Sequence, residues 1–160
     1  MPSSEYYAGF FDGDGGIWVQ HKMPSNLHEY FRVSCEVTNL EKSIMDALLA
    51  DYGGHVYQVK HRTGQRPFYR WVTNRKGAIK FLESIYPYAI IKKNRIKLAL
   101  EATNIQKNRK MGWMEKGESR YTTEQIKRLN EIIMEMRADN SHRKRLDGGK
   151  MGPQPKTAQN

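Results

Sequence analysis

The stretch Tyr7-Ala8-Gly9-Phe10-Phe11-Asp12-Gly13-Asp14-Gly15 decides how this chain is organised. An apolar segment of helical character runs over residues 5–11 and ends where two acids alternate with glycines. Such a turn suggests a hard divalent cation, because glycine lets the backbone bend and bring carbonyl oxygens to the ion. An EF-hand loop starting at Asp12 is excluded, since its glycine position holds Ile17 and its glutamate position holds Met23. A purely structural Asp-Gly hairpin turn stays open as the alternative.

Hydrophobic periodicity predicts the elements that follow this stretch. Alternating residues predict two pairs of strands, and apolar residues at helical spacing predict helices after each pair. Thr122, with Gln125 as its capping-box partner, is expected to start a last helix. The expected strands are 17–23, 31–38, 55–62 and 67–74, and the expected helices are 5–11, 41–52, 75–86, 92–107 and about 122–138. Paired strands followed by helices indicate an α+β fold, an antiparallel sheet with helices on one face.

Length and charge bound the possible functions. The chain has 160 residues, about one domain, with 27 Lys+Arg against 17 Asp+Glu and a formal net charge of +10. The excess is concentrated in residues 51–110, which carry a net +11. We expect this surface to attract a polyanion, with nucleic acid the leading candidate and a solvated basic face the alternative. We expect a single domain over residues 1–138, with a core at 5–108, and a basic tail at 139–160.

Other classes of protein are disfavoured by what the sequence contains. Cys35 is its single cysteine, which excludes an intrachain disulfide, a thiolate zinc cluster and a C-x-x-C redox pair. The first residues have neither a basic nor an apolar signal-like region, and no apolar run approaches the roughly 20 residues of a membrane span. We therefore expect an intracellular protein that acts where its nucleic acid is, without a membrane partner.

The polar face of the predicted sheet is the candidate binding surface. A two-stranded ribbon fits the major groove of DNA, where Arg and Lys donate to guanine and Gln pairs with adenine. An ordinary hydrated sheet face is the alternative. The residues expected on this face are Trp18, Gln20, Lys22, Arg32, Ser34, Glu36, Gln58, Lys60, Arg62, Tyr69, Trp71 and Thr73.

Residues 7–15, which read YAGFFDGDG, resemble the LAGLIDADG signature of the homing endonucleases. The positions that match are Ala8, Gly9, Asp12, Asp14 and Gly15, while Gly13 replaces the usual alanine. The predicted order of elements over roughly residues 5–108 is also that of the family. The resemblance implies an αββαββα domain with a saddle-like antiparallel sheet and an extra C-terminal helix here. It also implies a site-specific DNA homing endonuclease that supports intron mobility.

The activity implied by the resemblance is a metal-dependent double-strand break that leaves 3′ overhangs with 5′-phosphates. One copy of the motif implies a homodimer and a palindromic or nearly palindromic double-stranded DNA site, because the protein's two-fold symmetry is mirrored in its target. The residues expected at the dimer interface are Tyr7, Ala8, Gly9, Phe10, Phe11 and Asp12.

The resemblance also suggests catalytic residues. Asp14, the last acid of the motif, would bind the metal together with the carbonyl of Gly13. The expected ion is Mg²⁺, and Mn²⁺ or Ca²⁺ can occupy such a site. Lys92 is expected as the basic residue near the active site, and Asn39 as the polar residue that orients solvent. Two alternatives stay open, an RNA maturase that assists splicing and a DNA-binding regulator that does not cleave. The presence of both Asp12 and Asp14 argues against the regulator.

Overall fold

The structure is a computed structural model, and it describes residues 2–23, 29–60, 67–112 and 118–146, with side chains up to residue 139. The elements follow the predicted order. They are α1 (Ser4–Asp14), β1 (Gly15–Lys22), β2 (Tyr30–Asn39), α2 (Lys42–Tyr52), β3 (His55–Val59), β4 (Phe68–Asn74), α3 (Arg75–Ile85), α4 (Lys93–Lys107) and α5 (Thr123–Leu146). The α+β prediction is confirmed.

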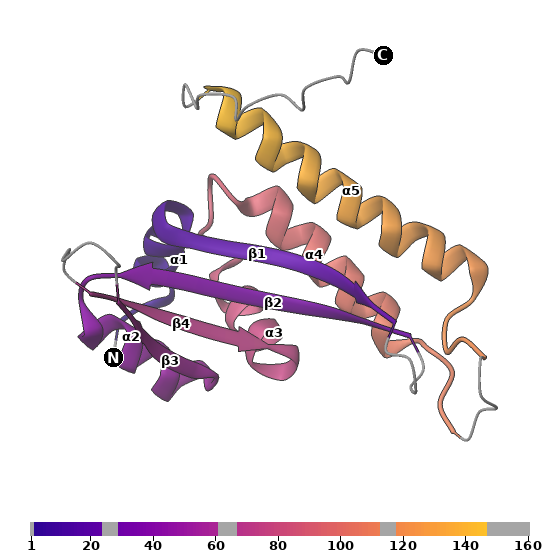
Figure 1. Cartoon of the computed structure of the whole chain (residues 1–160), viewed down its shortest axis with the longest axis horizontal. Helices are drawn as coiled ribbons and strands as arrows, with labels where there is room; N and C mark the ends of the chain where they lie inside the picture. Colours follow the sequence, from indigo (N-terminus) through magenta and orange to yellow (C-terminus); the bar gives the residue numbers. More distant parts are fainter. Residues whose placement is uncertain (1, 24–28, 61–66, 113–117, 147–160) are drawn as a thin grey trace, which may run out of the picture.

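The four strands form one antiparallel sheet in the order β1-β2-β4-β3. Helices α1 to α4 cover one face of this sheet, and α5 runs along α4 and the edge strand β1 (Figure 1). The core lies between the sheet and the helices. There the Phe11 and Trp71 rings each pack edge-to-face with the Phe81 ring, at centroid distances of 5.0 and 5.1 Å. No helix of the described ranges lies on the opposite face of the sheet, which we call the open face (Figure 1).

Helix α1 is longer than the sequence predicted. Asp12, Gly13 and Asp14 belong to its last turn, so the expected turn at these residues is wrong. The helix ends at Gly15, whose backbone is extended and whose N–H donates to the carbonyl of Phe11. A Cβ atom at Gly15 would lie 2.1 Å from the Phe11 ring, so only glycine lets the chain leave the helix beside this buried side chain.

Helix α5 begins with the predicted capping box. The Gln125 N–H donates to Thr122 Oγ1 over 3.2 Å, and the Thr122 N–H donates to Gln125 Oε1 over 3.0 Å. Buried Leu129, Ile132 and Met136 hold the helix against the core. It continues to Leu146, beyond the expected end at 138, so the start of the expected tail is helical; residues 147–160 lie outside the described ranges. No helix in the described part of the chain has the length and apolar character of a membrane span.

Candidate active site and nucleic-acid surface

Asp14 lies at the C-terminal end of α1, with an exposed side chain. Asn39, at the end of β2, donates a hydrogen bond from Nδ2 to Asp14 Oδ2 over 2.9 Å. The other end of the same amide, Oδ1, accepts from the Glu41 N–H over 3.0 Å. The Asn39 side chain is therefore held in place by the backbone of Glu41, and it in turn orients the Asp14 carboxylate. The structure brings these two sequence-predicted residues together.

Asp12 has a different environment, although it is only two residues from Asp14. Its carboxylate accepts hydrogen bonds from the backbone N–H groups of Ile90, Ile91 and Lys92 at 2.7, 3.0 and 2.9 Å. Burial favours the neutral acid, but these three donors and the nearby Lys92 ammonium outweigh it and hold the pKa of Asp12 below its ordinary value. Asp12 thus joins α1 to the start of α4, and Asp14 is the acid that faces solvent.

Lys92 lies beside the end of α1. Its ammonium donates to the carbonyl of Phe11 over 2.9 Å and to the carbonyl of Asp12. Its side chain is buried, and these contacts place a positive charge at the negative end of the α1 dipole. The neighbouring Lys93 instead donates to the carbonyl of Pro87 over 3.4 Å and is exposed, so Lys92 is the lysine beside the Asp14 end of the helix.

The outward face of α1 differs from the predicted interface. Tyr7, Ala8 and Phe11 are at most 1% exposed within the single chain, and Asp12 is 8% exposed. These four side chains face the chain's own core, so their assignment to a dimer interface is wrong. Gly9 and Phe10 do lie on the outward side. The outward positions at helical spacing are Tyr6, Gly9, Phe10 and Gly13, and a Cβ atom at either glycine would meet nothing within 4 Å.

The open face of the sheet is set by the register of its strands. Residues that pair directly across an antiparallel ladder place their side chains on the same face. Gln20 pairs with Arg32, and Arg32 Nη2 donates to Gln20 Oε1 over 2.9 Å. Trp18, Gln20, Lys22, Arg32, Ser34 and Glu36 lie on the open face as predicted, because their neighbours Ile17, Val19, Phe31, Val33, Cys35 and Val37 are buried on the other. Ser34 lies there with 3% of its surface exposed.

The predicted facing of β3 and β4 is wrong. Trp71 pairs with Val37, Thr73 pairs with Cys35, and both are buried on the helix-covered side. Tyr69 lies two residues before Trp71 on the same strand, so its side chain is on the same face. Gln58 pairs with Tyr69 across the ladder, so all four predicted residues lie on the helix-covered side. In Phe68–Asn74 the odd-numbered and the even-numbered positions both include large apolar side chains, so the sequence does not show which set is buried. Choosing the wrong set reverses the two faces of the strand. Lys60 follows β3 as an exposed residue outside the strand, and Arg62 lies outside the described residues.

Sequence reasoning therefore missed the residues that β3 and β4 present on the open face. Arg70 is the most informative of them, because its Nε lies 3.8 Å from Glu36 Oε2 on the neighbouring strand. The pairing of an acid on β2 with the single cation of β4 is the signal that identifies the correct face. The missed residues are His55, Tyr57 and Val59 on β3, and Phe68, Arg70 and Val72 on β4.

Two guanidinium groups of this surface have a donor without a hydrogen bond among the described residues. The Nε atoms of Arg32 and Arg70 are buried and have no hydrogen-bond partner in the described part of the chain. Both belong to guanidinium groups on the open face, where Arg32 donates through Nη2 to Gln20 and Arg70 lies within ion-pair distance of Glu36.

No protein-family model and no curated protein matches this sequence. Solved structures do match its fold. I-CvuI, a homing endonuclease in complex with a DNA target in the presence of Mg, has a TM-score of 0.61 and 21% identity over 85% of this chain and 80% of that chain. The homing endonuclease I-TnaI has a TM-score of 0.63 and 18% identity over 93% and 99%. The I-SmaMI LAGLIDADG homing endonuclease, bound to cleaved DNA, has a TM-score of 0.57 and 18% identity over 94% of this chain but 45% of its own. This chain has the fold of the LAGLIDADG homing endonucleases.

Proposed function

We propose that the chain is a site-specific DNA endonuclease that acts as a homodimer and hydrolyses both strands of a duplex with the help of a divalent cation. The observation that carries the proposal is the placement of Asp14. Its carboxylate is exposed at the end of a helix, is oriented by Asn39, and lies beside the edge of an open, cation-bearing sheet. The DNA-bound homing endonucleases of the same fold support this assignment.

The residues at the end of α1 fit a divalent cation. Asp14 Oδ1 and the carbonyl of Gly13 are hard oxygen donors of the kind that Mg²⁺ prefers, and the last carbonyls of a helix have no partner within it. The Lys92 ammonium donates hydrogen bonds to the Phe11 and Asp12 carbonyls, so those two oxygens already have a cationic partner from the protein. When bound, the cation supplies an activated water and neutralises charge that develops on the phosphate.

One chain contributes one such carboxylate. Within the described ranges, no group of three or more His, Cys, Asp or Glu side chains could hold a metal ion. Phosphate oxygens of DNA, water and a second copy of the chain would complete the site. The outward face of α1 suits that second copy, because Gly9 and Gly13 permit close approach of two backbones, while Tyr6 and Phe10 supply apolar area.

Ile90 extends this apolar surface beyond the helix. It is 84% exposed, and its backbone N–H binds the Asp12 carboxylate, so it lies beside the C-terminal half of α1. Two chains that meet at their α1 helices would bring two Asp14 side chains near the two-fold axis, one for each DNA strand. The two open sheet faces would then form one long saddle over a palindromic or nearly palindromic site.

In this proposal the residues of the chain have separate roles. The open sheet face holds the duplex through its major groove, with Gln20, Arg32 and Arg70 as base or phosphate contacts. Asp14 would hold the cation, and Asn39 fixes the orientation of its carboxylate. Cleavage across the minor groove would leave 3′ overhangs with 5′-phosphates and would support intron mobility.

A binding selection followed by cleavage tests the proposal. The full chain is used to enrich sites from a duplex library with randomised inverted repeats, in Ca²⁺. The enriched duplexes are then incubated with Mg²⁺ or with EDTA. We expect linear products only with Mg²⁺. Specific binding without cleavage would instead identify a regulator, and failure to enrich any duplex, together with stimulated splicing of an intron RNA, would identify a maturase; either result contradicts the proposal.

A further inference from the structure

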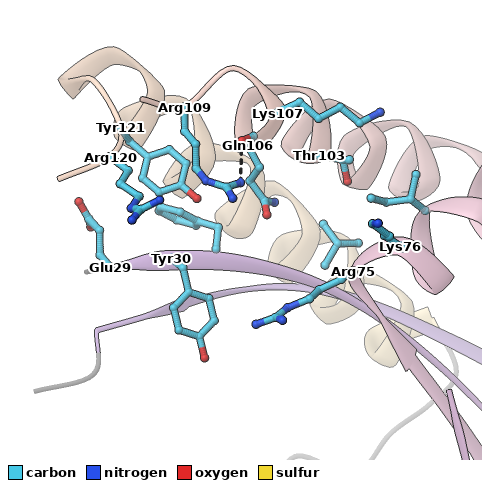
Figure 2. A pocket seen from close by; sticks show the side chains of 13 residues that line it. Glu29, Tyr30, Arg75, Lys76, Thr103, Gln106, Lys107, Arg109, Arg120 and Tyr121 are labelled. Atoms are coloured by element: carbon cyan, nitrogen blue, oxygen red, sulfur yellow. Dashed lines mark hydrogen bonds between the residues drawn. The ribbon is translucent and has the colours of Figure 1, made fainter. Parts of the chain in front are cut away.

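A cavity of about 670 Å³ lies on the helix-covered side of the sheet. Its walls come from the start of β2, the start of α3, the end of α4 and the segment that precedes α5 (Figure 2). β4 ends where Asn74 pairs with Ser34, so among the described residues β2 from Tyr30 to Val33 has no strand partner on that side, and the cavity lies against this edge. The Tyr121 ring packs edge-to-face against Phe31 at this edge, with a centroid distance of 5.3 Å.

The rim of the cavity is strongly basic. Five cations line it, Arg75, Lys76, Lys107, Arg109 and Arg120, and in the described part of the chain none of them forms a salt bridge. The acid that lines it, Glu29, is already engaged, because its Oε2 lies 2.9 Å from His21 Nε2 and its Oε1 accepts from the Ser119 hydroxyl. The cavity therefore has an unbalanced positive charge.

Arg75 reaches this rim through an unusual backbone conformation. Its φ is 51°, which makes it the one non-glycine residue with a positive φ in the described ranges. A residue with a Cβ adopts this left-handed region at an energetic cost, so the surrounding structure must hold it there. Figure 2 shows the Arg75 guanidinium extending along β2 toward Tyr30. This is the part of β2 that lies beyond the end of β4.

The inner wall is mainly apolar and aromatic, and the polar residues on it are Gln106 and Thr103, whose hydroxyl donates to the carbonyl of Ala99. Phe31, Val33, Ile79 and the Tyr121 ring form its apolar part, and Arg109 and Arg120 lie next to Tyr121 at one end (Figure 2). Gln106 also lines the cavity, and its Nε2 is buried without a hydrogen-bond partner in the described structure. A buried amide donor of this kind is costly unless something accepts from it, and a ligand with an acceptor atom would do so.

The cavity is separate from the Asp14 site. Asp14 is bonded to Asn39 at the last residue of β2, whereas the cavity begins at Tyr30, the first residue of that strand. Ten residues of extended strand span about 30 Å. The wall residues Phe31 and Val33 also point to the face opposite the open one, so the inner wall lies away from a duplex on the open face, whereas Tyr30 at the rim pairs with Lys22 and lies on the open-face side of β2 (Figure 2).

We infer that this cavity binds a nucleoside phosphate, with the base against the Tyr121 and Phe31 wall, the Gln106 amide donating to the base, and the phosphate among the rim cations. A flat ring with an anionic group matches an apolar wall under unpaired arginines and lysines. The ligand is a free nucleotide or an unpaired nucleotide of a strand, two sources of the same chemistry. This inference is independent of the proposed endonuclease activity.

Calorimetric titration of the full-length chain with AMP, with inorganic phosphate and with a hexanucleotide of uridine tests the inference. We expect AMP to bind and phosphate alone to bind more weakly, because it lacks a ring. Lys76→Gln and Arg120→Gln each remove one rim cation and should weaken AMP binding about fivefold. Lys127→Gln, which removes an exposed cation from α5, is the matched control and should leave AMP binding unchanged. If the hexanucleotide binds far more tightly than AMP with the same dependence on the rim, the source is a strand; similar affinities indicate a free nucleotide.

A second readout locates the ligand and keeps the two proposals apart. In NMR spectra the side-chain amide signal of Gln106 should shift with AMP, and Asp14→Asn should bind AMP as the wild type does. Duplex DNA should not displace AMP. The inference is overturned if neither AMP nor the hexanucleotide binds, or if phosphate binds as tightly as AMP. It is also overturned if the rim variants bind AMP as the control does, or if duplex DNA displaces AMP. Cleavage assays on Lys76→Gln report on the endonuclease proposal alone.

Discussion

Asn39 donates a hydrogen bond to Asp14 across 2.9 Å and is itself fixed by the N–H of Glu41. This contact joins the end of α1 to the end of β2, and it orients the one acid of the motif that faces solvent. Asp12, two residues earlier, is instead bound by three backbone N–H groups. The two carboxylates therefore have separate roles, one in binding a cation and one in holding the fold.

The first prediction concerns Asp14. Asp14→Asn should reduce cleavage by about 10³-fold or more, because it removes the charged cation ligand and several kcal/mol of transition-state stabilisation. Duplex binding and thermal stability should change little, since the side chain is exposed. Cleavage of the selected duplex and its binding in Ca²⁺ are measured side by side. Wild-type turnover by the variant would rule out the role given to Asp14.

The second prediction concerns Asp12. Asp12→Asn should lower the free energy of unfolding by about 2–3 kcal/mol, because an amide presents N–H groups to three backbone donors that now face a carboxylate. Asp46→Asn is the control, an exposed acid paired with Lys42 one helical turn away, and should cost less than about 0.5 kcal/mol. Urea unfolding measures both.

The stability difference should depend on pH in one direction. The pKa of Asp12 is lower in the folded than in the unfolded chain, so its contribution is fully present above about pH 4 and is lost as pH falls through the folded value. The gap between wild type and Asp12→Asn should therefore narrow on acidification. A gap that stays constant down to pH 2 would show that the charge of Asp12 contributes nothing.

The sequence predicted some elements of the fold better than others. Periodicity was enough for the order of helices and strands, because each buries one face. It could not show that α1 continues through Asp14, since the glycines read locally as a turn. The last turn is held from outside the helix, by Lys92 on its carbonyls and by the backbone of residues 90–92 on Asp12.

The candidate site was predicted in part for similar reasons. The family resemblance suggested Asp14, Asn39 and Lys92; the structure joins Asn39 to Asp14 and places Lys92 on the carbonyls of Phe11 and Asp12, and their catalytic roles stay predictions. The interface was misassigned because the motif letters do not show which side of the helix faces the chain's own sheet. The facing of β4 was misassigned because Trp71 reads as a surface aromatic, whereas its Nε1 donates to the carbonyl of Gly53 over 2.8 Å inside the core.

The third prediction tests the outward face of α1. Gly9→Leu adds a side chain where a Cβ meets nothing within 4 Å of the single chain, so the folded chain should tolerate it. Between two α1 helices the same side chain would prevent close approach, and self-association should be lost in sedimentation velocity. Glu83→Leu, which changes another exposed position, on α3, should leave association intact. Equal association of both variants would place the dimer contact elsewhere.

The fourth prediction tests the facing of β4. Arg70→Ala should weaken binding of the selected duplex by about 1–3 kcal/mol and, if Arg70 reads a base, relax the preference at one position in each half-site. Trp71→Phe should instead lower stability by about 1–2 kcal/mol through the lost hydrogen bond to Gly53, with unchanged affinity of the folded protein. The opposite pattern would mean that the strand presents Trp71, and not Arg70, to DNA.

The most direct measurement uses mixed dimers. Wild-type chains and Asp14→Asn chains with different affinity tags are coexpressed, and the species carrying both tags is isolated and incubated with a supercoiled plasmid that contains the selected site. Two chains that each use their own Asp14 on one strand should give nicked circles and almost no linear product. A mixed species that still linearises the plasmid at the wild-type rate, or a cleaving enzyme that never carries both tags, would contradict the account.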